Sequence, residues 1–273
     1  MIKYLYSVES ENISDFSGMP FLKKSLGQHF LKDEAVQRQI ADAIGDIGAF
    51  SRVIEVGPGM GALTRHLVKG KPENLYLIEL DDRWAEYQKT TYPFLSDRVI
   101  HQDFLKTDLT KILSYPTHIV GNFPYNISTE IVFTIIDHRD MITQMTGMFQ
   151  KEVGQRIAAK TRTKDYGVMS VLVQAYYEPT YLFDVQPEAF EPPPRVMSGV
   201  IKLVRKTEQL QCDEVAFKRI VKQAFTQRRK TMRNSLKGMI AGKNIADHLV
   251  FNQRPEELDV KGFETLTNLL ANN

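Results

Sequence analysis

Short apolar runs alternate with helical patterns through the first half of this chain, and this alternation constrains the fold more than any other feature. The runs have the composition of strands, and they are Arg52–Gly57, Asn74–Leu80, a run from Val99 that stops at Asp103, Thr117–Gly121 and Met145–Phe149. Between the last two, Thr129–Ile136 has its apolar residues at helical spacing. Strands that alternate with helices in this way form βαβ units. We therefore predict an α/β fold with a mostly parallel sheet that is covered on both faces.

The pattern changes after Lys151. Helices are predicted at Lys151–Ala159 and Val168–Tyr176, and strands at Tyr181–Val185 and Val196–Val204. A proline-rich connection, Glu191–Pro194, separates the two strands. Proline has no N–H for a central sheet ladder, so these residues are predicted to form a loop.

The polar stretch Lys206–Glu214 reads as a linker, and the patterns beyond it are purely helical. We therefore predict three parts. Residues 1–20 form an N-terminal extension, residues 21–208 an α/β domain, and residues 209–273 a small all-helical domain.

Composition excludes several classes of protein. Of 273 residues, 42% are hydrophobic and 25% are charged, which excludes a disordered chain. A single cysteine, Cys212, excludes a disulfide framework, and the six histidines lack ligand spacing, so we expect no metal. No apolar run approaches the roughly 18 residues that a membrane helix needs, and the N-terminus does not resemble a signal peptide. We expect a cytoplasmic protein without a membrane partner, and a monomer by default.

A glycine-rich turn, Glu55–Gly61, follows the first predicted strand. Glycines at such a turn let the backbone approach a ligand, and the next helix directs free N–H groups at it. In an open parallel sheet the ligand lies beyond the carboxyl ends of the strands, where Glu79 and Asp103 are also predicted. Glu79 is placed to accept both hydroxyls of a ribose, and Asp103 to accept from an adenine amine. We predict that Gly57, Gly59, Glu79 and Asp103 bind a cofactor that contains adenosine.

The spacing of the glycines separates two candidate cofactors. A dinucleotide oxidoreductase carries G-x-G-x-x-G, whereas the glycines here lie at positions 57, 59 and 61 and follow the acid Glu55. This arrangement suits S-adenosylmethionine better than a pyrophosphate. A nicotinamide-dependent oxidoreductase and a purely structural turn are the alternatives.

The fourth predicted strand ends in Asn122-Phe123-Pro124-Tyr125. The amine of adenine is a poor nucleophile, because its lone pair is delocalised into the ring. The Asn122 side-chain carbonyl and the backbone carbonyl of Phe123 or Pro124 could accept its two N–H groups and return the lone pair to nitrogen. Tyr125 offers an aromatic face for a base, worth about 1–3 kcal/mol. The alternative is a simple turn, which Asn and Pro often form.

Net charge is only +2, but the positive charge is concentrated. Residues 215–243 contain no acid and nine cations. We expect Arg228, Arg229, Lys230 and Arg233 to lie close together on helices and to follow a phosphate backbone. A solvated helix face is the alternative.

These motifs together resemble the methyltransferases that act on the N6 of adenine. Four further segments resemble one family among them, the KsgA-type ribosomal RNA adenine dimethyltransferases. The segments are Leu26–Leu31, Phe149–Val153, Phe190–Ser198 and Phe225–Leu236. The resemblance covers the chain from about residue 21 to 240, in order.

The resemblance implies a Rossmann-like methyltransferase domain and a helical RNA-binding domain. It implies that S-adenosylmethionine contacts Gln28, His29, Leu31, Gly57, Glu79, Asp103 and Asn122. Many members have Asn where this chain has His29, and Phe123 replaces the usual Leu or Ile. Phe190 would be a second aromatic wall around the flipped adenine.

The family transfers two methyl groups to each of two adjacent adenines, in a hairpin near the 3′ end of 16S rRNA. The substrate is the 30S subunit or its precursor. A non-catalytic ribosome assembly or RNA-binding factor with the same fold is the alternative, and the intact Asn122–Tyr125 segment argues against it.

Overall fold

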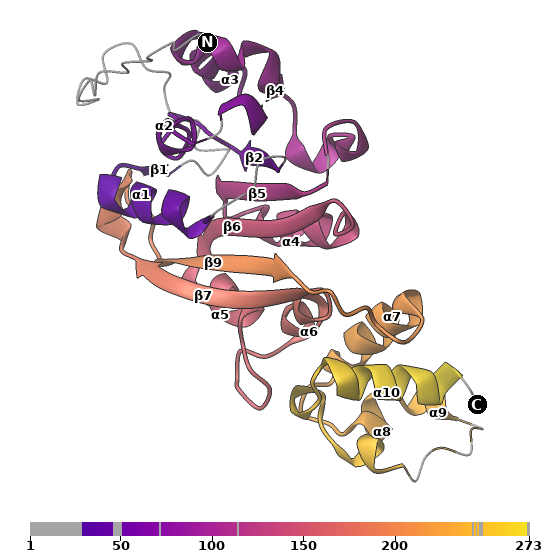
Figure 1. Cartoon of the computed structure of the whole chain (residues 1–273). Helices are drawn as coiled ribbons and strands as arrows, with labels where there is room; N and C mark the ends of the chain where they lie inside the picture. The colour runs from indigo at the N-terminus through magenta and orange to yellow at the C-terminus, as the bar shows by residue number, and fades with distance from the viewer. Residues whose placement is uncertain are drawn as a thin grey trace.

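Figure 1 shows the chain in a computed structural model, which describes residues 29–45, 51–70, 72–113, 115–241, 243, 245 and 248–271. The predicted extension over residues 1–20 lies outside these ranges, and so does Gln28. None of the helices within them is long and apolar enough to cross a membrane.

A seven-stranded sheet forms the centre of the molecule, in the order β4-β3-β2-β5-β6-β9-β7. Its strands are β2 (Arg52–Val56), β3 (Leu75–Glu79), β4 (Val99–His101), β5 (Thr117–Asn122), β6 (Ile142–Gln150), β7 (Tyr177–Val185) and β9 (Ser198–Arg205). The first five in the spatial order are parallel, and β9 and β7 are antiparallel additions at one edge. The predicted mostly parallel, Rossmann-like sheet is confirmed.

Helices pack on both faces of this sheet, and helices also follow its last strand (Figure 1). They are α1 (Glu34–Ala43), α2 (Thr64–Leu67), α3 (Asp82–Thr91), α4 (Ser128–Asp137), α5 (Lys151–Ile157), α6 (Val168–Gln174), α7 (Glu214–Phe225), α8 (Met232–Ser235), α9 (Lys237–Ile240) and α10 (Val260–Ala271).

Adjacent residues of the central strands belong to different hydrophobic clusters. On β5, Ile119 packs with Ile135 of α4, whereas Val120 belongs to a cluster that includes Ile40 of α1. Successive side chains of a strand point to opposite faces, so each face has its own apolar layer. This explains why the central strands read as continuous apolar runs rather than as alternating ones.

Two features of the strands differ from the sequence-based prediction. Strand β7 begins at Tyr177, four residues earlier than predicted, and it includes Pro179. Because β7 is an edge strand, a residue without an N–H is tolerated there. A second small sheet was not predicted, in which β1 (Phe30–Leu31) pairs antiparallel with β8 (Phe190–Glu191).

The chain leaves the sheet at Arg205, and α7 begins at Glu214 after a segment without helix or strand. Asp213 caps α7 by accepting the Ala216 N–H at 2.6 Å. Phe217 of α7 and Phe263 of α10 belong to the same hydrophobic cluster as α4, so the terminal helices share a core with one face of the sheet. The division at residue 208 stays a prediction.

The expectation that all four basic residues lie on helices is wrong. Helix α7 ends at Phe225, and Arg228, Arg229 and Lys230 lie in the turn before α8. Of the four residues, only Arg233 lies on a helix, α8. Phe225 and Met232, on either side of the turn, pack against or within the core, so the polar residues between them lie on the outside.

Candidate active site

The glycine turn after β2 has a backbone that favours glycine at three positions. The φ angles of Gly57, Gly59 and Gly61 are 68°, 50° and 80°, a region that other residues rarely adopt. The Gln88 side chain donates to the carbonyl of Gly59 at 2.7 Å and holds the turn against α3. A Cβ on Gly57 would meet no atom within 4 Å, so the backbone there borders open space.

Glu79 ends β3 and faces this turn. Its carboxylate accepts the N–H of Gly59 at 3.0 Å and the N–H of Asp81 at 2.9 Å. Burial raises the pKa of Glu79, and the two backbone N–H groups oppose that shift. The tertiary structure therefore fixes the acid beside the glycine turn, as the sequence predicts.

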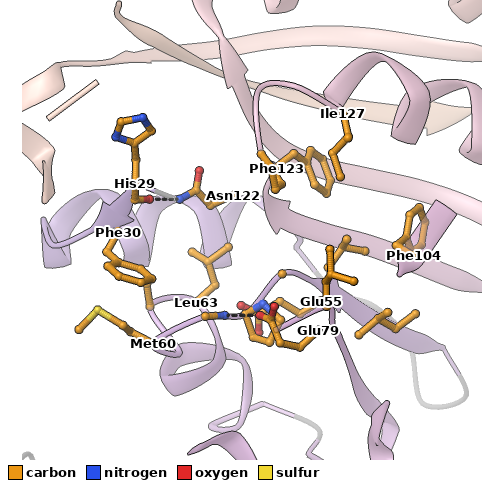
Figure 2. A pocket seen from close by; sticks show the side chains of 18 of the residues that line it. His29, Phe30, Glu55, Met60, Leu63, Glu79, Phe104, Asn122, Phe123 and Ile127 are labelled. Atoms are coloured by element: carbon orange, nitrogen blue, oxygen red, sulfur yellow. Dashed lines mark hydrogen bonds between the residues drawn. The ribbon is translucent and has the colours of Figure 1, made fainter. Parts of the chain in front are cut away.

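Glu55, at the start of the turn, is a second buried acid on the same side of the cavity (Figure 2). Thr64 donates its hydroxyl to Glu55 at 2.7 Å. Burial is the main cause that raises the pKa of Glu55 to about 8, and the nearby charge of Glu79 adds to it. Glu55 is therefore mostly protonated at neutral pH.

Asp103 follows β4, and its carboxylate accepts the N–H of Leu105 at 3.0 Å. Lys106 lies 3.6 Å from the other carboxylate oxygen. Phe104, the residue after Asp103, lines the same cavity and supplies an apolar surface there.

Asn122, the last residue of β5, points into the cavity (Figure 2). Its side-chain nitrogen donates to the carbonyl of His29 at 3.0 Å. This bond fixes the orientation of the amide, so Oδ1 is the atom left to accept a hydrogen bond from a substrate.

Phe123 lines the cavity, but its ring is buried in the core. The side chain is 1% exposed and packs edge-on against Phe149, with the ring centroids 5.1 Å apart. Gly121 and Gly147 are paired across β5 and β6, and Cβ atoms on them would lie 2.7 Å and 2.1 Å from the Phe123 ring. These two glycines make the space that the ring fills.

Tyr125 is held at both ends. Its hydroxyl lies 2.6 Å from the Ser198 hydroxyl, and its backbone carbonyl accepts from the Ser128 hydroxyl at 3.1 Å. Burial raises the pKa of Tyr125. The His29 ring stacks on Tyr125 with the centroids 5.8 Å apart, and its Nδ1 lies 2.9 Å from the carbonyl of Pro192.

Phe190 is the predicted aromatic residue that the structure does not bring to the cavity. It is 1% exposed, pairs with Leu31 across β1 and β8, and belongs to the hydrophobic cluster on the α1 face. The ring that faces Tyr125 is His29 instead. Contact between Phe190 and a target base stays a prediction.

The predicted cofactor and catalytic residues, apart from Phe190, line one cavity. They are His29, Leu31, Gly57, Gly59, Glu79, Asp103, Asn122, Phe123, Pro124 and Tyr125. The sequence-based reasoning missed Phe30, Met60 and Ile127, which also line it. For two of them the available signal was position, because Phe30 lies between the predicted residues His29 and Leu31, and Met60 lies between two glycines of the turn.

The four predicted RNA-binding residues lie elsewhere, near the turn between α7 and α8. Arg229 and Lys230 are exposed. Arg228 is engaged, because its guanidinium donates to the carbonyls of Thr163 and Lys164 at 2.9 Å and 2.5 Å. Arg233 reaches Asn252 at 3.5 Å.

Comparisons with solved structures agree with this architecture. A dimethyladenosine transferase from Plasmodium falciparum aligns with a TM-score of 0.73 at 23% identity, over 87% of this chain and 96% of that one, which shows the shared fold. The 23S rRNA methyltransferase ErmE aligns with a TM-score of 0.61 at 25% identity, over 88% of this chain and 99% of that one.

Comparisons of sequence find relatives of higher identity than these solved structures. The chain is 47% identical to the ribosomal RNA small subunit methyltransferase A of Cytophaga hutchinsonii over 250 residues, which is 91% of this chain and 97% of that protein. It is 48% identical to the protein of the same name from Bacteroides fragilis over 90% of this chain and 91% of the relative. Residues 21–268 match the family described as ribosomal RNA adenine dimethylase. The chain therefore belongs to the ribosomal RNA adenine dimethylase family.

Proposed function

We propose that this enzyme transfers methyl groups from S-adenosylmethionine to the N6 amines of two adjacent adenines in a hairpin near the 3′ end of 16S rRNA. The product is N6,N6-dimethyladenosine, and the substrate is the 30S subunit or its precursor in the cytoplasm. The observation that carries the proposal is that the glycine turn, Glu79, Asp103 and the Asn122–Tyr125 segment line a single cavity. We further propose that the chain acts as a monomer in small-subunit biogenesis.

The residues of the cavity fit S-adenosylmethionine. The open space beside Gly57 admits a ligand against the backbone, and the buried Glu79 carboxylate retains lone pairs for ribose hydroxyls. Asp103 would accept from the adenine amine, and His29, Leu31 and Asn122 border the same space. When bound, the cofactor supplies an electrophilic methyl group on a sulfonium.

Activation of the target amine would rest on two acceptors. Asn122 Oδ1 is one, because the bond from Nδ2 to His29 orients the amide. The carbonyl of Pro124 already accepts the N–H of Ile127 at 3.2 Å, which favours the carbonyl of Phe123 as the second. Two acceptors on the N–H groups would make the nitrogen more tetrahedral and return its lone pair. The buried Phe123 ring holds this backbone in place.

Tyr125 would stack on the adenine once the base has left its hairpin. Loop bases are the least costly to unstack, and stacking on an aromatic ring returns about 1–3 kcal/mol. Most of the rate would come from orientation of the amine toward the methyl group. Methyl transfer leaves a positive charge on the nitrogen and makes it far more acidic than the free amine, so its proton can leave to water without a dedicated base.

The helical part would bind the RNA. We propose residues 21–208 as the methyltransferase domain and residues 209–273 as the rRNA-binding domain. The exposed Arg229 and Lys230, with Arg233 next to them, would contact phosphates.

The direct test is methyl transfer to unmodified 30S particles with labelled S-adenosylmethionine, followed by digestion of the 16S rRNA. Dimethyladenosine in the digest supports the proposal. Asn122→Ala should abolish transfer while the protein stays folded, and full activity of that variant would contradict the mechanism. Particles that bind the protein without gaining label would instead support a non-catalytic assembly factor.

A further inference from the structure

The loop between α5 and α6 carries a second group of positive charges. Lys160, Arg162 and Lys164 lie within five residues of sequence, and all three are exposed. This group is distant in sequence from the basic turn between α7 and α8. In Figure 1 the loop extends from the sheet toward the terminal helices.

Arg228 joins the two groups. Its guanidinium donates to the carbonyls of Thr163 and Lys164, so the turn that contains Arg229 and Lys230 lies against this loop. A cation that bonds to backbone carbonyls keeps its full charge. The tertiary contact therefore adds positive charge to the junction and brings two basic segments together.

Arg162 occupies a backbone conformation that favours glycine. Its φ is 66°, the one positive value for a residue other than glycine in the described part of the chain. Its N–H donates to the carbonyl of Glu256 at 2.7 Å, which holds the loop in this shape. An arginine at such a position costs stability, and strain of this kind is often retained for function.

Within the described ranges, Lys160, Arg162, Lys164, Arg229 and Lys230 form no ion pair with an acid. Exposed lysines elsewhere in the chain do form such pairs, as Lys106 does with Asp103 and Lys111 with Asp108. Two acids lie next to the group, Asp165 and Glu256, whose carbonyl accepts the Arg162 N–H, and both are half-buried. The local excess of positive charge is therefore large for a protein whose net charge is +2.

We propose that Lys160, Arg162 and Lys164 form one composite basic surface with Arg229 and Lys230, and that this surface binds the phosphodiester backbone of rRNA. The proposal rests on the proposed function, because it extends the RNA contact from the helical part onto the α/β part. This composite basic surface, rather than the helices alone, then positions the RNA relative to the catalytic cavity.

The test compares binding of unmodified 30S particles between about 50 and 200 mM salt. The variant Lys160→Ala/Arg162→Ala/Lys164→Ala should bind roughly tenfold to a hundredfold more weakly at the low-salt end, with a salt slope smaller by about 2 to 3. A control variant, Lys69→Ala/Lys89→Ala/Lys111→Ala, loses the same charge elsewhere and should bind like the wild type. Affinity for S-adenosylmethionine, measured by calorimetry, should be unchanged in both.

Single substitutions of Arg162 separate charge from structure. Arg162→Gly removes the cation and relieves the backbone, so it should weaken binding while the thermal midpoint is no lower than that of Arg162→Ala. Arg162→Lys keeps the charge and should retain most of the affinity and the salt slope.

Two results would overturn the proposal: a loop variant with wild-type affinity and salt slope, or equal losses in the loop and control variants. Failure of the proposed function is a separate result, because the wild-type chain would then produce no dimethyladenosine at all.

Discussion

The hydroxyl of Tyr125 lies 2.6 Å from the hydroxyl of Ser198, and this contact ties the loop after β5 to the first residue of β9. Ser198 is fully buried and is paired with Gln150 of β6 and Val185 of β7. It is therefore a rigid anchor. A ring held in this way is already oriented before a base arrives, which lowers the entropy lost on binding.

Removal of this bond should lower activity without loss of the fold. The net contribution of one hydrogen bond is about 1 kcal/mol. Ser198→Ala and Tyr125→Phe should therefore each lower kcat/KM for 30S methylation about fivefold. The double variant should be no worse than either single one, because both delete the same bond. Additive losses would show that the two hydroxyls act separately. Ser170→Ala, at another fully buried serine, is the control and should leave kcat/KM unchanged.

Gly147→Ala should disrupt the catalytic loop from a distance. The added Cβ would lie 2.1 Å from the Phe123 ring, so the ring or the strand must move. Overpacking of this kind costs about 1–3 kcal/mol. We expect a lower thermal midpoint and weaker methyl transfer. Phe123→Leu in the same chain should recover much of both, and failure of that rescue would show that the glycine is needed for another reason.

Glu55 should make stability depend on pH. Burial raises its folded-state pKa from an ordinary 4.5 to about 8, so the folded protein holds a proton that the unfolded chain has lost. The contribution of Glu55 to the free energy of unfolding is then complete below about pH 4.5. It is lost as the pH rises toward 8, by up to about 1.4 kcal/mol per pH unit. His118 has its pKa lowered to about 4 by burial, so it is neutral in both states near pH 8 and adds no slope there.

Thermal midpoints between pH 7 and 8.5 measure this effect. The midpoint of the wild type should fall over that range, and that of Glu55→Gln should fall less. Parallel curves for the two proteins would show that Glu55 is ionised throughout.

Arg228 and Arg229 are neighbours with different expected roles. Arg228→Ala removes two hydrogen bonds to the α5–α6 loop and should lower the thermal midpoint by roughly 2–4 °C. Arg229→Ala removes an exposed cation and should leave the midpoint unchanged, while it weakens 30S binding and reduces the salt slope by about 1. Equal midpoints for the two variants would contradict the structural role of Arg228.

The sequence by itself determined the sheet and most of the cavity. Apolar periodicity is a local property, so it located the parallel strands, and the carboxyl ends of parallel strands lie at one edge of a sheet. Glu79, Asp103 and Asn122 follow such strands, and this was enough to predict that they lie together.

The tertiary structure alone decided the contacts between residues far apart in the chain. No local pattern shows that β1 pairs with β8 and brings His29 over Tyr125, or that Phe190 is buried. The same holds for Arg228, which reads as one more cation in a basic run until its bonds to residues 163 and 164 are seen. Such contacts depend on how whole elements pack, because the energy of each is small and many partners are chemically equivalent.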